Sequence, residues 1–223
     1  MPKKLARLTL KEQADKALRE MISSYRFLPG KWINVERLAK DLGVSRTPVW
    51  QAMMDLEKEG LVEHIPNQGI RMAEMTLQMA YDLYTVRGLL EGLAGRFAAE
   101  NINKRTVGRL ESIIGEQKKM VENQDVVGYS KSDFRFHGLI YETCGNWLLR
   151  DLLENIKARA RPFVCDIRPI ISGLYQDHIE AVDAMRNHDP ARAERVMRKH
   201  NLRMRRRIEW TQEMGGRGMT NGQ

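Results

Sequence analysis

Residues 35–62 read VERLAKDLGVSRTPVWQAMMDLEKEGLV, and the pattern within them decides the fold of the N-terminal part of the chain. Apolar residues recur at helical spacing over about Val35–Asp41, and Gly43 follows as a typical helix terminator. Ser45 is a favourable N-cap, and we expect the helix that it starts to run to about Glu59. The stretch therefore predicts two short helices joined by a tight turn.

The flanking segments extend this unit on both sides. Leu10–Arg26 has helical apolar spacing and ends before a proline-glycine turn. Strands are predicted at 61–65 and 70–72, with 66–69 as the turn between them. The order helix, helix, turn, helix, hairpin is that of a winged helix-turn-helix.

Beyond about Glu74 no further strand pattern is found. Six amphipathic helices are predicted at about 77–101, 104–123, 127–143, 147–167, 173–187 and 190–214. Short loops between them favour an antiparallel bundle. We therefore expect a mainly α protein with a winged helix-turn-helix domain at 1–74, a helical domain at 75–214 and a disordered glycine-rich tail at 215–223.

Composition narrows the class of protein. The net charge of the 223 residues is +8, but eight basic residues against one acid between Arg192 and Arg207 account for +7 of it. Charge alone therefore does not indicate nucleic acid. No apolar run approaches a membrane span or a secretory leader, so we expect a cytoplasmic protein without membrane contact. Cys144 and Cys165 lack metal-ligand spacing and are expected to be reduced thiols.

The start of the third helix carries groups suited to DNA. In a helix-turn-helix the second helix of the motif enters the major groove with its N-terminal residues on bases and phosphates. Arg46 is placed to donate two hydrogen bonds to guanine, and Gly69 lets the backbone of the hairpin tip approach DNA closely. The candidate DNA-binding residues are Ser45, Arg46, Thr47, Trp50, Gln51, Asn67, Gln68 and Gly69.

Taken as a whole, this region resembles the GntR family of bacterial regulators over about residues 10–74. The resemblance is carried by Leu28-Pro29-Gly30, Leu38-Ala39-x-x-Leu42-Gly43-Val44-Ser45-Arg46-Thr47-Pro48-Val49, Leu56-Glu57-x-Glu59-Gly60-Leu61-Val62 and Pro66-Asn67-x-Gly69. It implies a homodimer on pseudo-palindromic double-stranded operator DNA. The chain departs from the family pattern at Trp50, where a DNA-contacting arginine is usual, and at Glu36, near another arginine of some relatives.

Histidines in the helical part form a second pattern. Asp133 and His137 are four residues apart and project from one helix face, while His178 and His200 fall on the fifth and sixth predicted helices of the bundle. Facing helices can bring such groups together on one divalent metal. The spacing alone is equally compatible with the absence of a metal site. In that case Asp133 and His137 would form a pair on the helix surface, and the other two histidines would simply be packed in the protein.

A further resemblance bears on this choice. Val86-Arg87-x-x-Leu90-Glu91, Asp133-x-x-Phe136-His137, Asp177-His178-x-x-Ala181-Val182 and Asp189-Pro190-Ala191 leading to His200 look like the ligand-binding domain of the FadR subfamily, over about residues 77–210. The resemblance implies that Asp133, His137, His178 and His200 hold zinc or nickel, which helps to bind a small carboxylate. Arg87 is the candidate effector-binding residue; the alternative is a surface arginine paired with Glu91.

These observations predict a transcriptional regulator, more specifically a repressor, whose operator affinity responds to a carboxylate bound at a metal site. Two alternatives remain at this point. One is a helical metal-dependent enzyme that uses the aspartate and the histidines, although no separate general base or phosphate-binding loop accompanies them. The other is a DNA-binding protein without an effector response.

Overall fold

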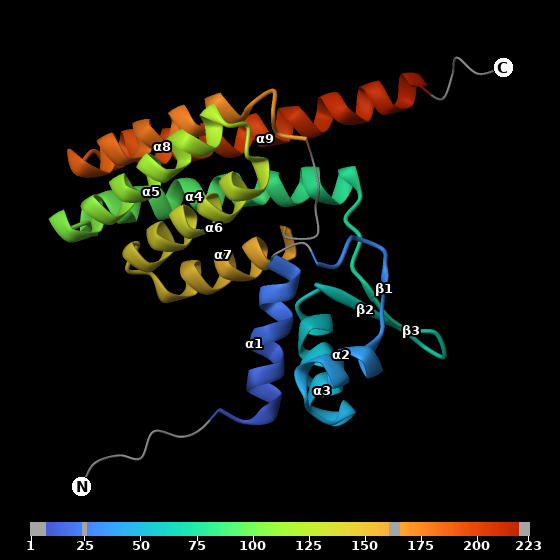
Figure 1. The fold of residues 1–223 in the computed structure, drawn as a ribbon. Helices are drawn as coiled ribbons and strands as arrows, with labels where there is room; N and C mark the ends of the chain where they lie inside the picture. Colours follow the sequence, from blue (N-terminus) through green and yellow to red (C-terminus); the bar gives the residue numbers. More distant parts are fainter. Residues whose placement is uncertain (1–7, 24–25, 161–165, 219–223) are drawn as a thin grey trace, which may run out of the picture. The chain divides into compact units, whose positions relative to one another are not determined.

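The computed structural model describes residues 8–23, 26–160 and 166–218. The described residues up to Met75 form one compact unit, and those from Thr76 onward form another. The first unit contains α1 (Leu10–Ser23), β1 (Trp32–Ile33), α2 (Val35–Leu42), α3 (Arg46–Lys58), β2 (Val62–Ile65) and β3 (Gly69–Met72), as Figure 1 shows.

Local capping explains where α2 and α3 begin and end. The Asn34 side chain accepts a hydrogen bond of 2.8 Å from the Arg37 backbone N–H and caps α2. Gly43 ends the helix with a φ of 66°, a left-handed conformation that glycine adopts without strain. Ser45 precedes α3 in an extended conformation, and its side chain makes no capping bond. The predicted helix, turn and helix are confirmed.

The sheet has three antiparallel strands in the order β1-β3-β2. The predicted hairpin is confirmed, with Val62 opposite Met72 and Ile65 opposite Gly69. Sequence analysis missed β1, whose Ile33 lies opposite Ile70. A strand of two residues is too short to show an alternating pattern, and only its pairing with β3 reveals it.

The first unit is held together by one apolar core. α1 packs against α3, and the sheet closes the core next to α3. Its most buried members are Leu18, Val49, Ala52, Met53, Leu56, Leu61, Val62, Ile70 and Met72. Val49 and Met53 face inward on α3, so the first-turn residues around Arg46 remain on the opposite, exposed side.

The second unit is entirely helical within its described residues. It comprises α4 (Leu77–Asn101), α5 (Lys104–Glu122), α6 (Val126–Thr143), α7 (Trp147–Ala160), α8 (Ile171–Arg186) and α9 (Pro190–Gly218). Thr76, Asn103, Asp125 and Asp189 each accept a hydrogen bond from a backbone N–H three residues on and cap α4, α5, α6 and α9. Together with the winged helix-turn-helix, this confirms the predicted mainly α fold.

Two predicted boundaries of the second unit are wrong. The helix expected over 147–167 is observed over Trp147–Ala160, and Asp166 and Ile167 are not helical; residues 161–165 lie outside the described residues. Helix α9 continues to Gly218, so residues 215–218 of the expected tail are helical, while 219–223 lie outside the described residues. Cys165 also lies outside them, and Cys144 is a buried free thiol. Across the described ranges, no helix is both long and apolar enough to cross a membrane.

Glycines on α4 allow α9 to approach it closely. A Cβ added at Gly92 would stand 2.4 Å from the Cγ of Arg198, and one at Gly95 would stand 2.7 Å from the Cγ of Met197. A Cβ added at Gly88 would stand 3.2 Å from the Cβ of Asn201, which is closer than most side-chain contacts. This close approach brings the middle of α4, which carries Glu91, against the part of α9 that carries the histidine of the site described next.

Candidate functional site

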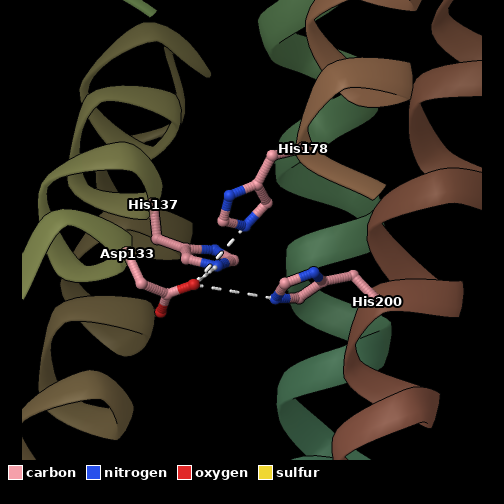
Figure 2. Close-up of side chains that lie close together, drawn as sticks. All are labelled: Asp133, His137, His178 and His200. Atoms are coloured by element: carbon pink, nitrogen blue, oxygen red, sulfur yellow. Dashed lines mark ion pairs between the residues drawn. The ribbon is translucent and has the colours of Figure 1, made fainter. Parts of the chain in front are cut away.

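Four polar side chains converge inside the helical unit. Asp133 and His137 project from α6, His178 from α8 and His200 from α9, and Figure 2 shows them turned toward one another. One ligand atom from each lies within 4.8 Å of the others. The three histidines are almost completely buried. The structure therefore brings together all four residues that the sequence suggested as metal ligands.

The inner atoms of this cluster are arranged around one carboxylate oxygen. The Oδ1 atom of Asp133 lies 3.5 Å from Nε2 of His137, 3.4 Å from Nε2 of His178 and 3.9 Å from Nε2 of His200. The Nε2 atoms of His137 and His178 are buried without a hydrogen-bond partner. Unpartnered imidazole nitrogens beside a carboxylate are the donor set that zinc and nickel prefer, so the residues present fit a divalent ion.

Polar side chains lie beside the outer nitrogens of two histidines. Nδ1 of His137 lies 2.9 Å from Oε1 of Glu91, and Nδ1 of His178 lies 2.9 Å from Oε1 of Gln117. Gln117 accepts from Nδ1 of His178 and so leaves the His178 Nε2 lone pair free to bind a metal, whereas Glu91 contacts Nδ1 of His137 as an ion pair without hydrogen-bond geometry. Sequence analysis did not find these contacts of Glu91 and Gln117, and no spacing rule points to Gln117.

Glu91 is the centre of a buried network. Its carboxylate accepts hydrogen bonds from Nε of Arg87 at 2.8 Å, from Nδ2 of Asn201 at 2.6 Å and from the Tyr141 hydroxyl. Glu91 is fully buried and Arg87 is 5% exposed. Arg87 therefore does form the pair with Glu91 considered from the sequence, but in the interior of the protein instead of on a helix surface.

The charges of the cluster favour metal binding at neutral pH. Burial alone would lower the pKa of His137, but the carboxylates of Glu91 and Asp133 raise it to about 9. Burial and the histidine neighbours lower the pKa of His200 to about 4 and that of His178 well below its usual value. Burial would raise the pKa of Asp133, but the three histidines hold it well below its usual range. Two imidazoles and a carboxylate are thus ready to bind, and one imidazole must first lose a proton.

The candidate DNA-binding residues lie on the surface of the first unit. Five of them form the exposed first turns of α3: Ser45, Arg46, Thr47, Trp50 and Gln51. Arg46 forms an ion pair of 2.8 Å with Glu36 of α2, and both side chains are mainly exposed. The Trp50 ring meets His64 of β2 edge to face, with the ring centroids 5.3 Å apart. Both departures from the family pattern therefore lie beside the helix start.

The other three candidate residues lie at the turn between β2 and β3. Asn67 and Gln68 are exposed, and Gly69 is half-buried. Asn67 and Gly69 have φ angles of 63° and 110°. These left-handed conformations make the tight tip of the wing, which keeps the side chains of Asn67 and Gln68 outward.

Comparison with known proteins identifies both parts of the chain. Residues 10–72 match the family described as bacterial regulatory proteins, gntR family, and residues 82–203 match the FCD domain. The chain belongs to the GntR family of regulators with an FCD domain. Members of this family are transcriptional regulators, which excludes the enzyme considered from the sequence.

Several bacterial regulators are similar to this GntR protein. The HTH-type transcriptional regulator YdhC of Bacillus subtilis (strain 168) is 31% identical over 140 residues, which are 62% of each chain. The repressor RspR of Escherichia coli (strain K12) is 25% identical over 85% of this chain and 84% of its own. The E. coli repressor NanR is 27% identical over 88% and 83% of the respective chains.

A solved structure shares the fold. E. coli McbR/YncC superposes with a TM-score of 0.79 at 18% identity, over 92% of this chain and 99% of its own. At this identity the similarity establishes the fold alone.

Proposed function

We propose that this GntR regulator is a homodimeric repressor whose affinity for operator DNA is changed by a small carboxylate bound at a metal ion in the FCD domain. The observation that carries the proposal is the buried ring of imidazole Nε2 atoms around one oxygen of Asp133. The names of the relatives RspR and NanR describe both as repressors. Residues 1–74 would bind DNA, and 75–214 would bind the effector and the second subunit.

Asp133, His137, His178 and His200 would hold the metal, with zinc or nickel as the ions best matched to these ligands. When bound, the ion supplies a Lewis-acid centre with an open position for a carboxylate oxygen. The positive charge of Arg87 contributes to the field at the centre, and we propose it as the group that compensates the effector's charge. Its pairing with Glu91 means that an effector would compete for it.

DNA would be bound by α3 in the major groove and by the wing beside it. Arg46 is the residue that we expect to pair with a guanine, a contact that provides about 1–3 kcal/mol of discrimination between bases. Ser45 keeps its hydroxyl available for phosphate, because it makes no capping bond. Trp50 has a single donor and no charge, so it cannot replace the arginine that relatives carry and would change the preferred base step.

An exposed apolar face of the helical unit supports the homodimer. Val86, Leu89 and Leu93 lie on one face of α4 and are each more than one third exposed. On α7, which packs beside α4, Leu148 and Leu152 are also exposed. Several large apolar side chains exposed on two packed helices are typical of an association surface. A second copy of the chain, related by a two-fold axis, would place two α3 helices on a pseudo-palindromic operator.

Selection of bound duplexes from a random library tests the proposal. The full chain, at fixed salt, should enrich a two-fold symmetric sequence, because two identical α3 helices bind equivalent half-sites. Arg46→Ala should lose most of this enrichment. Arg135→Ala is the control, since it removes another exposed, ion-paired guanidinium, from the helical unit. Enrichment of no sequence by the parent protein would refute the proposed function.

A further inference from the structure

Trp50 lies at the boundary between the buried and the exposed faces of α3. Val49 and Met53 of the same helix are fully buried, whereas 37% of the Trp50 side chain is exposed. Trp50 also follows Arg46 by four residues, so the two side chains project from the same face of the helix. A large apolar ring therefore lies beside the residue that we expect to contact a base.

The side chain of His64 meets this ring from the wing. Side chains alternate along a strand, and His64 shares its face of β2 with Val62, which is 1% exposed. Ile70, the partner of His64 on β3, is equally buried. The imidazole therefore lies on the side of the sheet that faces the core and α3, opposite to the side of Glu63.

Two contacts fix the position of the imidazole against the indole. The ring centroids of Trp50 and His64 are 5.3 Å apart with an interplanar angle of 83°, the edge-to-face arrangement that aromatic pairs prefer. The backbone N–H of His64 donates a hydrogen bond of 3.2 Å to Oε1 of Glu57, two helical turns after Trp50 on α3. Because this bond holds β2 against α3 at the same residue, the imidazole supports the indole on one side and leaves the rest of it exposed.

The chemistry of the indole determines what it can contact in DNA. It has one N–H donor and no acceptor, so it cannot make the two-point contact that distinguishes guanine or adenine. The rest of the ring system is carbon. The apolar group that bases present in the major groove is the 5-methyl group of thymine. An exposed, supported indole on α3 is thus best matched to a thymine.

We propose that Trp50 contacts the 5-methyl group of a thymine in each operator half-site, and that His64 is the positioning residue that holds the indole for this contact. The proposal rests on the proposed function, because it takes α3 to lie in the major groove. It adds the identity of one base and the chemical group by which that base is recognised.

Deoxyuridine in place of single thymines tests the inference, because uracil keeps the hydrogen-bonding atoms of thymine and lacks its methyl group. Fluorescence anisotropy with the full-length protein measures the dissociation constant of the selected operator, with thymines replaced one at a time. At one thymine in each half-site, the replacement should weaken binding about fourfold, and about 15-fold when both are replaced, as expected for the burial of one and two methyl groups. A selected operator that no replacement weakens, or one without thymine in its half-sites, would overturn the inference.

A variant of Trp50 shows which side chain makes the contact. In Trp50→Ala the same replacement should change the affinity by less than about 1.5-fold, because the partner of the methyl group is gone. Thr47→Ser is the control, since it removes an exposed methyl group from the first turn of α3 and should keep the fourfold effect. A fourfold effect that persists in Trp50→Ala would overturn the assignment to the indole.

The ratio of the dissociation constants for uracil and thymine duplexes separates positioning by His64 from a structural role. Without the imidazole the indole can turn, so His64→Ala should reduce the ratio to about twofold or less, whereas damage to the wing would weaken both duplexes equally. His64→Phe keeps an aromatic ring beside Trp50 and should keep the ratio near fourfold. Glu63→Gln, on the other face of β2, is the control. An unchanged ratio in His64→Ala would overturn the positioning role.

The failure of this inference can be distinguished from that of the proposed function. A selected, two-fold symmetric operator that binds uracil and thymine duplexes equally would overturn the thymine contact alone. A parent protein that enriches no sequence from the library would overturn both proposals.

Discussion

Neutralising Glu91 should weaken the helical unit more than any surface change of the same chemistry. Glu91→Gln keeps the size of the side chain and one of its two acceptor oxygens, so either Tyr141, which donates to Oε1, or Asn201, which donates to Oε2, keeps its acceptor. It removes the negative charge from beside Arg87 and His137, and Arg87 then remains buried without a counter-charge. The free energy of unfolding should fall by the cost of breaking a buried ion pair.

The burial of both partners sets the expected size of the effect. Glu91 is fully buried and Arg87 is 5% exposed. Breaking such a pair costs about 3–5 kcal/mol. In a chain of this length each kcal/mol changes the melting temperature by about 2–4 °C, so a decrease of about 6–20 °C is expected.

Thermal unfolding followed by far-UV circular dichroism, in a chelator, measures this decrease without a contribution from metal. Glu116→Gln is the matched control, because Glu116 pairs with Arg135 on the surface, where both side chains are about half exposed. An exposed pair contributes at most about 1 kcal/mol. Similar melting temperatures for the two variants would refute the reasoning.

A second comparison isolates the charge. Arg87→Met combined with Glu91→Gln removes both members of the pair and should melt above Glu91→Gln alone, since no unpaired charge remains buried. A double variant less stable than Glu91→Gln would show that packing, not charge, explains the loss.

The remaining predictions concern the metal centre and the DNA-binding surface. Zinc at about 100 times its dissociation constant should stabilise the parent by about 2.7 kcal/mol, and His178→Ala should melt at the same temperature with and without zinc. Because the pKa of His137 is about 9 while His178 and His200 are already neutral, zinc binding near pH 7 should release about one proton. Calorimetry in buffers of different ionisation enthalpy counts the protons, and three would contradict the charge assignment. Trp50→Arg should change the base preference in a library selection, and an unchanged preference would exclude base reading by the indole. Glu36→Gln should tighten DNA binding by a few fold in fluorescence anisotropy, because it frees Arg46 from its ion pair; weaker binding would indicate that the pair orients Arg46 for DNA.

Much of the fold was predictable from local signals. Glycine and capping residues such as Gly43 and Asp189 ended or started helices where the sequence indicated. The errors lie where local signals are weak or compete. The two residues of β1 have no pattern of their own, and the apolar periodicity over 147–167 extended the expected helix to Asp166 and Ile167, which are not helical.

Within the candidate site, only the four candidate metal ligands were predictable from the sequence. Spacing joined Asp133 to His137, the predicted bundle placed His178 and His200 on further helices, and the resemblance to a family favoured a shared metal site; the fold brings all four together. The side chains that contact these ligands from neighbouring helices were not predictable. An example is Gln117 of α5, which contacts His178 of α8. Such contacts depend on the rotation of each helix about its axis, which a single sequence does not specify.

We propose that a metal held by Asp133 and the three histidines controls DNA binding by residues 1–74. Anisotropy of a labelled, selected operator measures it most directly, with the full chain zinc-loaded, zinc-loaded with a binding carboxylate, or chelated. We expect the carboxylate to change operator affinity by about 5–150-fold in the zinc-loaded protein, and His178→Ala to abolish this response. Equal operator affinity in all three states would contradict it.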